Sequence, residues 1–168
     1  MEPTGERQVK SALDPEPWRQ ELLHFVRRLG AGADAEDIVQ ETFLRWIEAP
    51  PSHQPRAWLY RVALNVLRDQ RRRYKTAALA LELHVPPMPA AELEPSWQAE
   101  RHGIAARALA VITTLPERQQ LALLLRTQRH MDYDEIATVL GCSVPTARQH
   151  FHLGVKAVRD RLEERSDE

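Results

Sequence analysis

The sequence predicts an all-α fold of two small helical domains joined by a flexible linker, on three observations. Ala, Leu, Arg and Glu, all strong helix formers, make up nearly half of the 168 residues. The chain has only 6 glycines, too few for a turn-rich β-sandwich or barrel. Ten of its 12 prolines gather at 3–17, 50–55 and 86–95, and helical periodicity fills the stretches between these clusters.

The first domain is predicted over residues 15–76 as three helices. The apolar residues from Trp18 to Leu29 recur at the spacing of one helix face, and the glycines at 30 and 32 end that helix. A second helix is expected over 34–48, where acidic residues in the first turn suit the helix dipole. Its apolar stripe is wider than a small three-helix core requires and comprises Ile38, Val39, Thr42, Phe43, Trp46 and Ile47.

A third helix is expected over 56–73, after a proline-rich loop at 49–55. Its predicted buried residues are Trp58, Leu59, Val62, Ala63, Val66 and Leu67. Residues 77–103 then form the predicted linker, because Pro86, Pro87 and Pro89 cannot lie inside a helix. Two alternatives stay open at the ends of the linker: residues 79–83 can extend the third helix by a turn, and Trp97 can start the next helix.

The second domain is predicted over 104–165. One helix is marked by Ile104, Ala108, Val111, Ile112 and Leu115. Pro116 suits the first turn of the next helix, which contains Leu121, Leu124 and Leu125. A short helix follows, with a capping box formed by Asp132 and Glu135 and a C-terminal cap at Gly141.

Ser143 is expected to cap the last helix, with Pro145 in its first turn. The apolar positions of this helix are Ala147, Phe151, Val155, Val158 and Leu162. Two helices joined by a tight glycine-containing turn predict a helix-turn-helix, whose exposed face presents Thr146, Arg148, Gln149, His152 and Lys156 to bases or phosphates. The alternative is an ordinary helical hairpin with solvated polar residues.

The charge pattern allows a nucleic-acid partner although the net charge is only −1. Residues 56–75 contain seven basic residues and one acid, whereas residues 77–100 contain four acids and neither Lys nor Arg. A basic helix with interleaved aromatics can neutralise phosphates and stack on unpaired bases, although such residues are more often a solvated face and core. The basic residues are nearly all arginine, which suits bidentate contacts.

Other classes are excluded or unsupported. A single cysteine, Cys142, cannot form an internal disulfide, and no apolar run reaches the roughly 18–20 residues of a membrane span, so a cytoplasmic protein without membrane insertion is expected. His150 and His152 point to different sides of a helix, which argues against a metal site. No constellation of acid, base and nucleophile can be assembled, so neither enzymatic activity nor a cofactor is expected.

Four motifs together resemble one family. They are DAEDIVQETFLRW at 34–46, PRAWLYRVALNVLRDQRRR at 55–73, LPERQQLALLLR at 115–126 and YDEIATVLGCSVPTARQHF at 133–151. The first two resemble domain two of an extracytoplasmic-function (ECF) sigma factor of the sigma-70 family, and the last two resemble its domain four. The resemblance implies a protein that binds core RNA polymerase, directs it to promoters and helps to melt DNA.

The resemblance also implies roles for particular residues. Docking on the polymerase β′ clamp helices falls to Asp37, Gln40, Glu41, Phe43 and Leu44. Recognition of the −10 element falls to the loop 49–55 with Arg56, Trp58, Tyr60, Arg61, Asn65 and Asp69. Recognition of the −35 element falls to Arg126, Arg148, Gln149, His152 and Lys156. The implied partners are core polymerase, through its β′ and β subunits, promoter DNA and an anti-sigma factor, with the acidic linker running through the polymerase channel.

The chain departs from the family pattern at His150, Leu153 and Val155, which stand where Arg or Lys is common. Weaker phosphate contact or a different −35 sequence follows from this departure. The short loop at 50–55 leaves the identity of any flipped −10 base open. Two alternatives therefore remain beside a sigma factor: a stand-alone operator-binding regulator, and a polymerase-docking adaptor that lacks −35 recognition.

Overall fold

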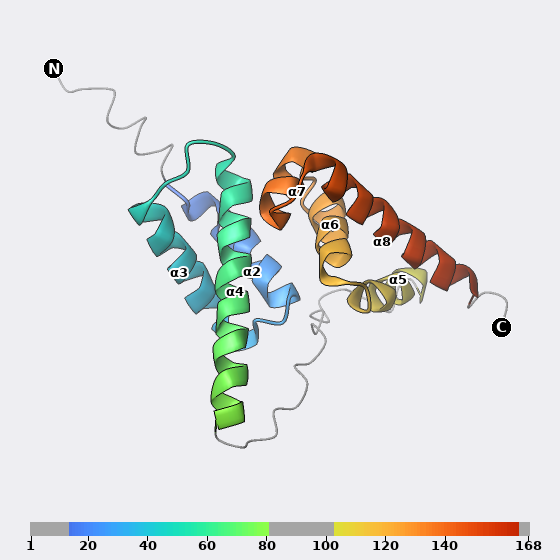
Figure 1. The fold of residues 1–168 in the computed structure, drawn as a ribbon, viewed down its shortest axis with the longest axis horizontal. Coiled ribbons are helices and arrows are strands. Elements are labelled where there is room, and N and C mark those ends of the chain that lie inside the picture. The colour runs from blue at the N-terminus through green and yellow to red at the C-terminus, as the bar shows by residue number, and fades with distance from the viewer. Residues whose placement is uncertain (1–13, 81–102, 165–168) are drawn as a thin grey trace. The chain divides into compact units, whose positions relative to one another are not determined.

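A computed structural model of the protein describes residues 14–80 and 103–164, and every regular element in those two ranges is helical (Figure 1). The chain divides into two compact units, Met1–Pro87 and Met88–Glu168. The predicted all-α class is therefore confirmed. Most of the predicted linker, residues 81–102, lies outside the described residues. None of the described helices is long and apolar enough to cross a membrane.

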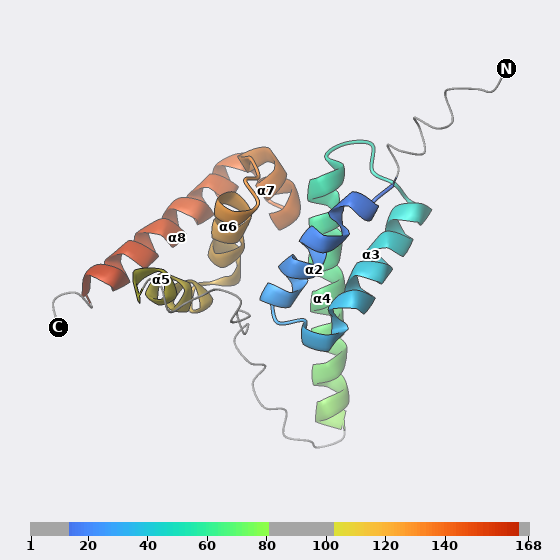
Figure 2. The same cartoon turned by 180° about the vertical axis from the view of Figure 1, so that it is seen from behind.

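The first unit is built around the long helix α4 (Pro55–Ala80), against which α2 (Arg19–Arg28) and α3 (Ala35–Glu48) both pack (Figure 2). Short 3-10 turns at Glu16–Trp18 and Gly32–Asp34 lead into α2 and α3. The helix α4 continues to Ala80, past the predicted domain end at residue 76, so the first of the two alternatives for this region is correct in part. The best-buried side chains of this unit include Leu22, Val26, Ile38, Val39, Trp46, Leu59, Tyr60 and Leu64.

The buried face of α4 is broader than the predicted one. Four of the six residues expected to be buried are buried, namely Leu59, Ala63, Val66 and Leu67, whereas Trp58 and Val62 are only half-buried. Ala57, Tyr60 and Leu64 are buried in addition. Two neighbouring helices cover α4, so its buried face is broader than a single stripe. The expected burial of Ile47 on α3 is also wrong, since this residue is 72% exposed near the helix end.

The second unit contains α5 (Gly103–Thr113), α6 (Glu117–Gln128), α7 (Tyr133–Leu140) and α8 (Val144–Glu164), and α8 packs against the other three. The predicted capping box is present: the Glu135 amide donates to Asp132 Oδ1 at 2.8 Å, and the Asp132 amide donates to Glu135 Oε2 at 3.1 Å. Gly141 ends α7 with a φ of 64°, a conformation that glycine adopts without strain. The Thr146 amide donates to Ser143 Oγ at 3.3 Å, as expected of a helix N-cap.

The helix α8 lies very close to α6 because one of its buried residues is Gly154. A Cβ at this position would lie 2.8 Å from Leu123 Cδ1 and 3.3 Å from the Gln119 carbonyl oxygen. The predicted apolar face of α8 is present, but its large residues are only half-buried and the fully buried positions are Ala147 and Gly154. The sequence pattern gave this glycine no role, because glycine contributes nothing to an apolar periodicity.

Candidate functional site

The exposed face of α3 carries an apolar pair. Leu44 is 57% exposed and Ile47 is 72% exposed, and they lie one turn apart on the same helix face. Neighbouring exposed apolar side chains of this size are typical of a protein–protein contact. Asp37 and Gln40 are exposed on the turns before Leu44, so the face is apolar at one end and polar at the other.

The other two predicted docking residues are less available. Glu41 is half-buried and forms an ion pair with Arg45, whose Nε lies 2.9 Å from Glu41 Oε1. Phe43 is 8% exposed, and the Arg19 guanidinium lies 4.9 Å from the centroid of its ring. A hydrogen bond to Glu16 raises the pKa of Arg19, so this guanidinium is charged at every physiological pH. Phe43 therefore packs on the buried side of α3. Ile47, which was predicted to lie in the core, belongs to the exposed face.

A row of polar side chains runs along the solvent face of α4. Arg61 and Asn65 are exposed, and Asp69, one turn further on, is half-buried. Asp69 Oδ1 lies 3.8 Å from Arg72 Nη2, which extends the row by another turn. These residues recur three or four positions apart, so they share one face of the helix. The row combines cationic, amide and carboxylate groups, which suits hydrogen bonding to base edges and phosphates.

Tyr60 does not belong to that face. Its side chain is fully buried, its ring centroid lies 4.7 Å from that of Phe25, and its hydroxyl donates to Glu21 Oε2 at 3.1 Å. Arg56 Nη2 donates to the same carboxylate oxygen at 3.0 Å. Tyr60 is therefore not part of the solvent face of α4 in this structure, and its predicted contact with DNA stays a prediction.

Trp58 lies at the edge of an aromatic cluster. Its ring meets that of Trp46 nearly edge-on, with the two ring centroids 5.6 Å apart. The ring of Trp46 also contacts that of Trp18, with centroids 6.0 Å apart. Trp58 is half-buried, so the residue is partly accessible to solvent, four positions after Gln54 at the end of the loop 49–54. The cluster holds the Trp58 ring in a fixed orientation, as contact with a base requires.

The face of α8 that carries Arg148, Gln149, His152 and Lys156 is exposed over all four residues. Arg126 of α6 is half-buried, and its Nη1 donates to the Met131 carbonyl oxygen at 2.8 Å. Leu153 is 43% exposed and Val155 is half-buried, so two positions near this face supply no charge. A helix with an exposed polar face near its N-terminal end has the form that enters a major groove.

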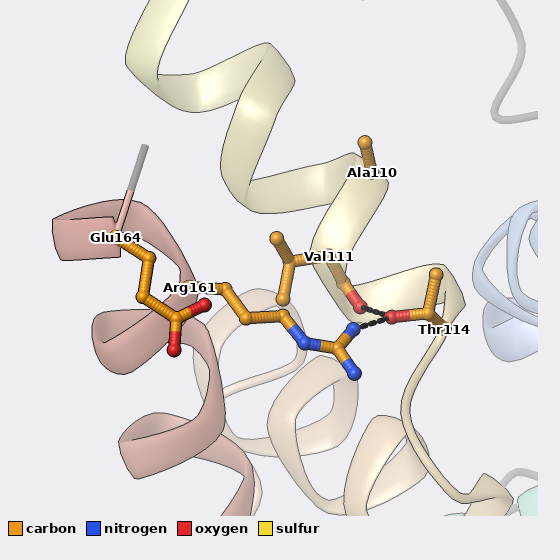
Figure 3. Close-up of a pocket in the computed structure, with 5 residues that line it drawn as sticks. All are labelled: Ala110, Val111, Thr114, Arg161 and Glu164. Carbon is orange, nitrogen blue, oxygen red and sulfur yellow. Dashed lines mark hydrogen bonds between the residues drawn. The ribbon is translucent and has the colours of Figure 1, made fainter. Parts of the chain in front are cut away.

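Two other features of the second unit lie outside this face. Cys142, in the turn between α7 and α8, is half-buried, and burial raises the pKa of its thiol against the opposing effect of Arg118. A pocket of about 360 Å³ lies between α5 and the end of α8, where Arg161 Nη1 donates to Thr114 Oγ1 (Figure 3). Arg161 is 13 residues from Arg148 along α8, about 20 Å at 1.5 Å per residue.

The described parts of the chain contain no group of three or more His, Cys, Asp and Glu side chains that could hold a metal ion. The pocket in Figure 3 is lined by Ala110, Val111, Thr114, Arg161 and Glu164.

Comparison with known protein families gives one consistent match. Residues 16–76 match Sigma-70 region 2, and residues 105–158 match Sigma-70, region 4. The ECF RNA polymerase sigma factor SigE of Mycolicibacterium smegmatis is 32% identical over 146 residues, covering 84% of this chain and 57% of SigE. SigJ of Mycobacterium tuberculosis is 37% identical over 153 residues, covering 85% of this chain and 48% of SigJ. The chain thus spans about half the length of these two relatives.

A third relative and two solved structures match over most of their lengths. SigL of Mycobacterium tuberculosis is 32% identical over 155 residues, covering 88% of this chain and 82% of SigL. The structure of CnrH in complex with the cytosolic domain of CnrY has a TM-score of 0.61 at 22% identity, over 95% of this chain and 90% of that one. The sigma factor RpoE in complex with the anti-sigma factor NepR, from Bartonella quintana, has a TM-score of 0.60 at 17% identity, over 94% and 96%. Because the two regions match in order and SigL matches over most of its length, the chain belongs to the ECF sigma factors of the sigma-70 family.

Proposed function

We propose that this protein binds core RNA polymerase and directs it to promoters, where it recognises two DNA elements and helps to open the duplex. The observation that carries the proposal is the presence of regions 2 and 4 in this order in one chain, each folded as its own compact unit. It acts where polymerase and DNA are, in the cytoplasm. It works by binding alone, with no cofactor or metal.

In the first unit, the exposed face of α3 docks on the β′ clamp helices of the polymerase. The exposed pair Leu44 and Ile47 supplies apolar contact area, and Asp37 and Gln40 supply polar contacts beside it. Burial of two such side chains is favourable because each contributes roughly 1.5–3 kcal/mol when fully removed from water. Glu41 and Phe43 contribute by holding this face in position.

The solvent face of α4 reads the −10 element. Arg61, Asn65 and Asp69 form the polar row, and the accessible part of Trp58 stacks on an unpaired base. Arg56 forms an ion pair with Glu21, and it contacts DNA only when this ion pair is broken. The loop 49–54 lies next to these residues and contributes to the same surface.

In the second unit, α8 enters the major groove of the −35 element. Arg148 and Gln149 lie near its N-terminal end, where bidentate pairing of Arg with guanine and Gln with adenine is geometrically suited. His152 offers one donor or acceptor, and Lys156 contacts a phosphate. Few phosphates are neutralised, so binding of a −35 duplex depends only weakly on salt. Region 4 as a whole docks on the β subunit.

Regulation by an anti-sigma factor is a further part of the proposal. The sigma factor RpoE of Bartonella quintana was solved in complex with such a partner, the anti-sigma factor NepR. Here the first unit carries the polymerase-docking face and the −10 face, and the second unit carries the −35 face, so one partner that contacts both units can mask all three. Purification of the chain from uninduced cells tests this, and recovery of no stable partner would favour control by expression level.

Run-off transcription with purified core polymerase on genomic fragments tests the proposed function. We expect defined transcripts only when the chain is added. Leu44→Glu places a charge on the docking face and is expected to abolish both the transcripts and pull-down of polymerase. Leu79→Glu is the matched control, because Leu79 is a 68% exposed leucine of the same unit on α4, and it should leave both intact.

The same experiment separates the alternatives. A stand-alone operator-binding regulator would bind DNA without polymerase and give no transcripts. An adaptor would bind polymerase yet give transcripts indifferent to the −35 sequence. Either result would overturn the proposal, as would normal co-purification of polymerase with Leu44→Glu.

A further inference from the structure

The ring of Tyr133, the first residue of α7, lies between helices that carry two of the predicted −35 residues. The guanidinium carbons of Arg126 on α6 and Arg148 on α8 lie 5.0 Å and 5.2 Å from the ring centroid. Both distances are within the range of a cation–π contact, which extends to about 6 Å. We propose that Tyr133 is a positioning residue that orients Arg148 for base recognition, an inference that rests on the proposed −35 function of α8.

Tyr133 is itself held rigidly. The capping box of Asp132 and Glu135 fixes the backbone at the start of α7 through bonds of 2.8 Å and 3.1 Å. The ring of Phe151, on α8, meets that of Tyr133 nearly edge-on with centroids 6.0 Å apart. The side chain is half-buried, so one part of the ring packs while another stays accessible. These contacts restrict the position of the Tyr133 ring, over which the Arg148 guanidinium lies.

Arg126 of α6 also contacts the Tyr133 ring and is itself held by a hydrogen bond. Its Nη1 donates to the carbonyl oxygen of Met131, a fully buried residue, at 2.8 Å. This bond joins the end of α6 to the segment that precedes α7. The bond and the ring contact together account for the half-buried state of Arg126. Arg126 thus helps to hold the Tyr133 ring in place, in addition to any contact that it makes with DNA.

Arg148 is the residue that gains from the arrangement. It is exposed, and within the described parts of the chain no carboxylate lies within ion-pair distance of it. A free arginine must lose rotamer freedom to pair with guanine, and a guanidinium already held over an aromatic ring loses less. Tyr133 therefore raises the affinity for the correct base without touching it.

The size of the effect follows from the contact. Cation–π contacts at exposed sites change equilibria by about two- to fivefold. We therefore expect loss of the ring to lower discrimination at the base read by Arg148 by about two- to fivefold. This is smaller than the effect of removing Arg148 itself, because the arginine would still reach the base from a less ordered state.

The test uses the full chain with core polymerase on a promoter and on a variant promoter with a substituted −35 base pair that still gives transcripts. The measured quantity is the ratio of transcription from the two. Tyr133→Leu removes the aromatic face and keeps apolar bulk, so the ratio should fall about two- to fivefold. Tyr133→Phe keeps the face, and the ratio should be retained. A variant that merely folds less well lowers both rates and leaves the ratio unchanged.

Arg148→Ala and the double variant with Tyr133→Leu complete a double-mutant cycle. If Tyr133 acts through Arg148, adding Tyr133→Leu to Arg148→Ala should have no further effect on the ratio. Additive effects, an unchanged ratio in Tyr133→Leu, or an equal loss in Tyr133→Phe would each overturn the positioning role while leaving the proposed function intact. If Arg148→Ala itself leaves the ratio unchanged, the −35 function of α8 and this inference both fail.

Discussion

The close contact of α6 and α8 depends on the absence of a side chain at Gly154. A Cβ there would lie 2.8 Å from Leu123 Cδ1, 3.0 Å from Leu123 Cγ and 3.3 Å from the Gln119 carbonyl oxygen. Leu123 is 5% exposed, so it has little room to move away. Gly154→Ala is the smallest substitution that fills this space, and its effect on stability can be worked out from two opposing contributions.

Alanine in a helix interior is favoured over glycine by about 0.8–1 kcal/mol. Overpacking a well-packed site by one methyl group costs about 1–3 kcal/mol. With the middle of the second range, the unfolding free energy of the second unit should fall by about 1 kcal/mol. For a domain of 60–100 residues that corresponds to a Tm lower by about 4–8 °C.

Thermal unfolding of the full chain provides the assay. Far-UV circular dichroism reports on the helices of both units, whereas tryptophan fluorescence reports mainly on the first, which contains Trp18, Trp46 and Trp58 of the chain's 4 tryptophans. Gly154→Ala should therefore lower the Tm of one circular-dichroism transition and leave the fluorescence transition in place.

A second substitution isolates the contact itself. Leu123→Val shortens the side chain that the new methyl group meets, and in that background Gly154→Ala should be neutral or stabilising. The difference between the two backgrounds is the coupling energy of the contact. A Gly154→Ala chain that is about 1 kcal/mol more stable than the unmodified chain would refute the reasoning, because it would mean that Leu123 gives way at no cost.

Tyr60→Phe removes the hydroxyl that donates to Glu21, and we expect the first unit to lose about 1 kcal/mol of unfolding free energy with promoter opening unchanged. If permanganate footprinting showed a defect in promoter opening while the unfolding free energy stayed unchanged, Tyr60 would have to contact DNA after all. Arg148→Ala should reduce promoter-specific transcription about tenfold. Lys156→Ala should instead weaken binding of all sequences alike and flatten the salt dependence, and a sequence-selective loss would contradict its assignment to a phosphate. Burial raises the pKa of the Cys142 thiol, so the native chain should be alkylated by iodoacetamide at a higher pH than the chain in urea. The unfolded thiol loses its proton at a lower pH than the folded thiol. The contribution of Cys142 to stability is therefore present below the unfolded pKa and is lost as the pH rises through the folded pKa. Identical alkylation profiles for the native chain and the chain in urea would contradict the raised pKa.

The features that could be predicted from the sequence are those formed by local interactions. The capping box, the left-handed cap at Gly141 and the N-cap at Ser143 each join residues within three or four positions of one another, so the residue types alone specify them. The proline clusters end helices for the same local reason. Helical periodicity likewise predicts the exposure of Arg148 and its neighbours on α8.

Burial on the long helices was decided by the tertiary structure. Both Trp58 and Tyr60 are aromatic residues of α4, yet Tyr60 is fully buried because α2 supplies Phe25 and Glu21 against it. Ile47 matches the apolar stripe of α3, but it lies near the helix end and stays exposed. Each outcome depends on which neighbouring helix covers the position.

The same distinction separates the predicted and unpredicted parts of the candidate site. The residues of α8 that face solvent could be predicted from sequence, because one helix and its period of about 3.6 residues set that face. The grouping of Arg126, Tyr133 and Arg148 could not, because three helices contribute to it. Its geometry depends on how closely α6 and α8 approach, and Gly154 permits that approach by omitting a side chain. A periodic pattern of apolar side chains gives no sign of a close helix contact at a residue without a side chain. The close approach of α6 and α8 is therefore seen only in the packed structure.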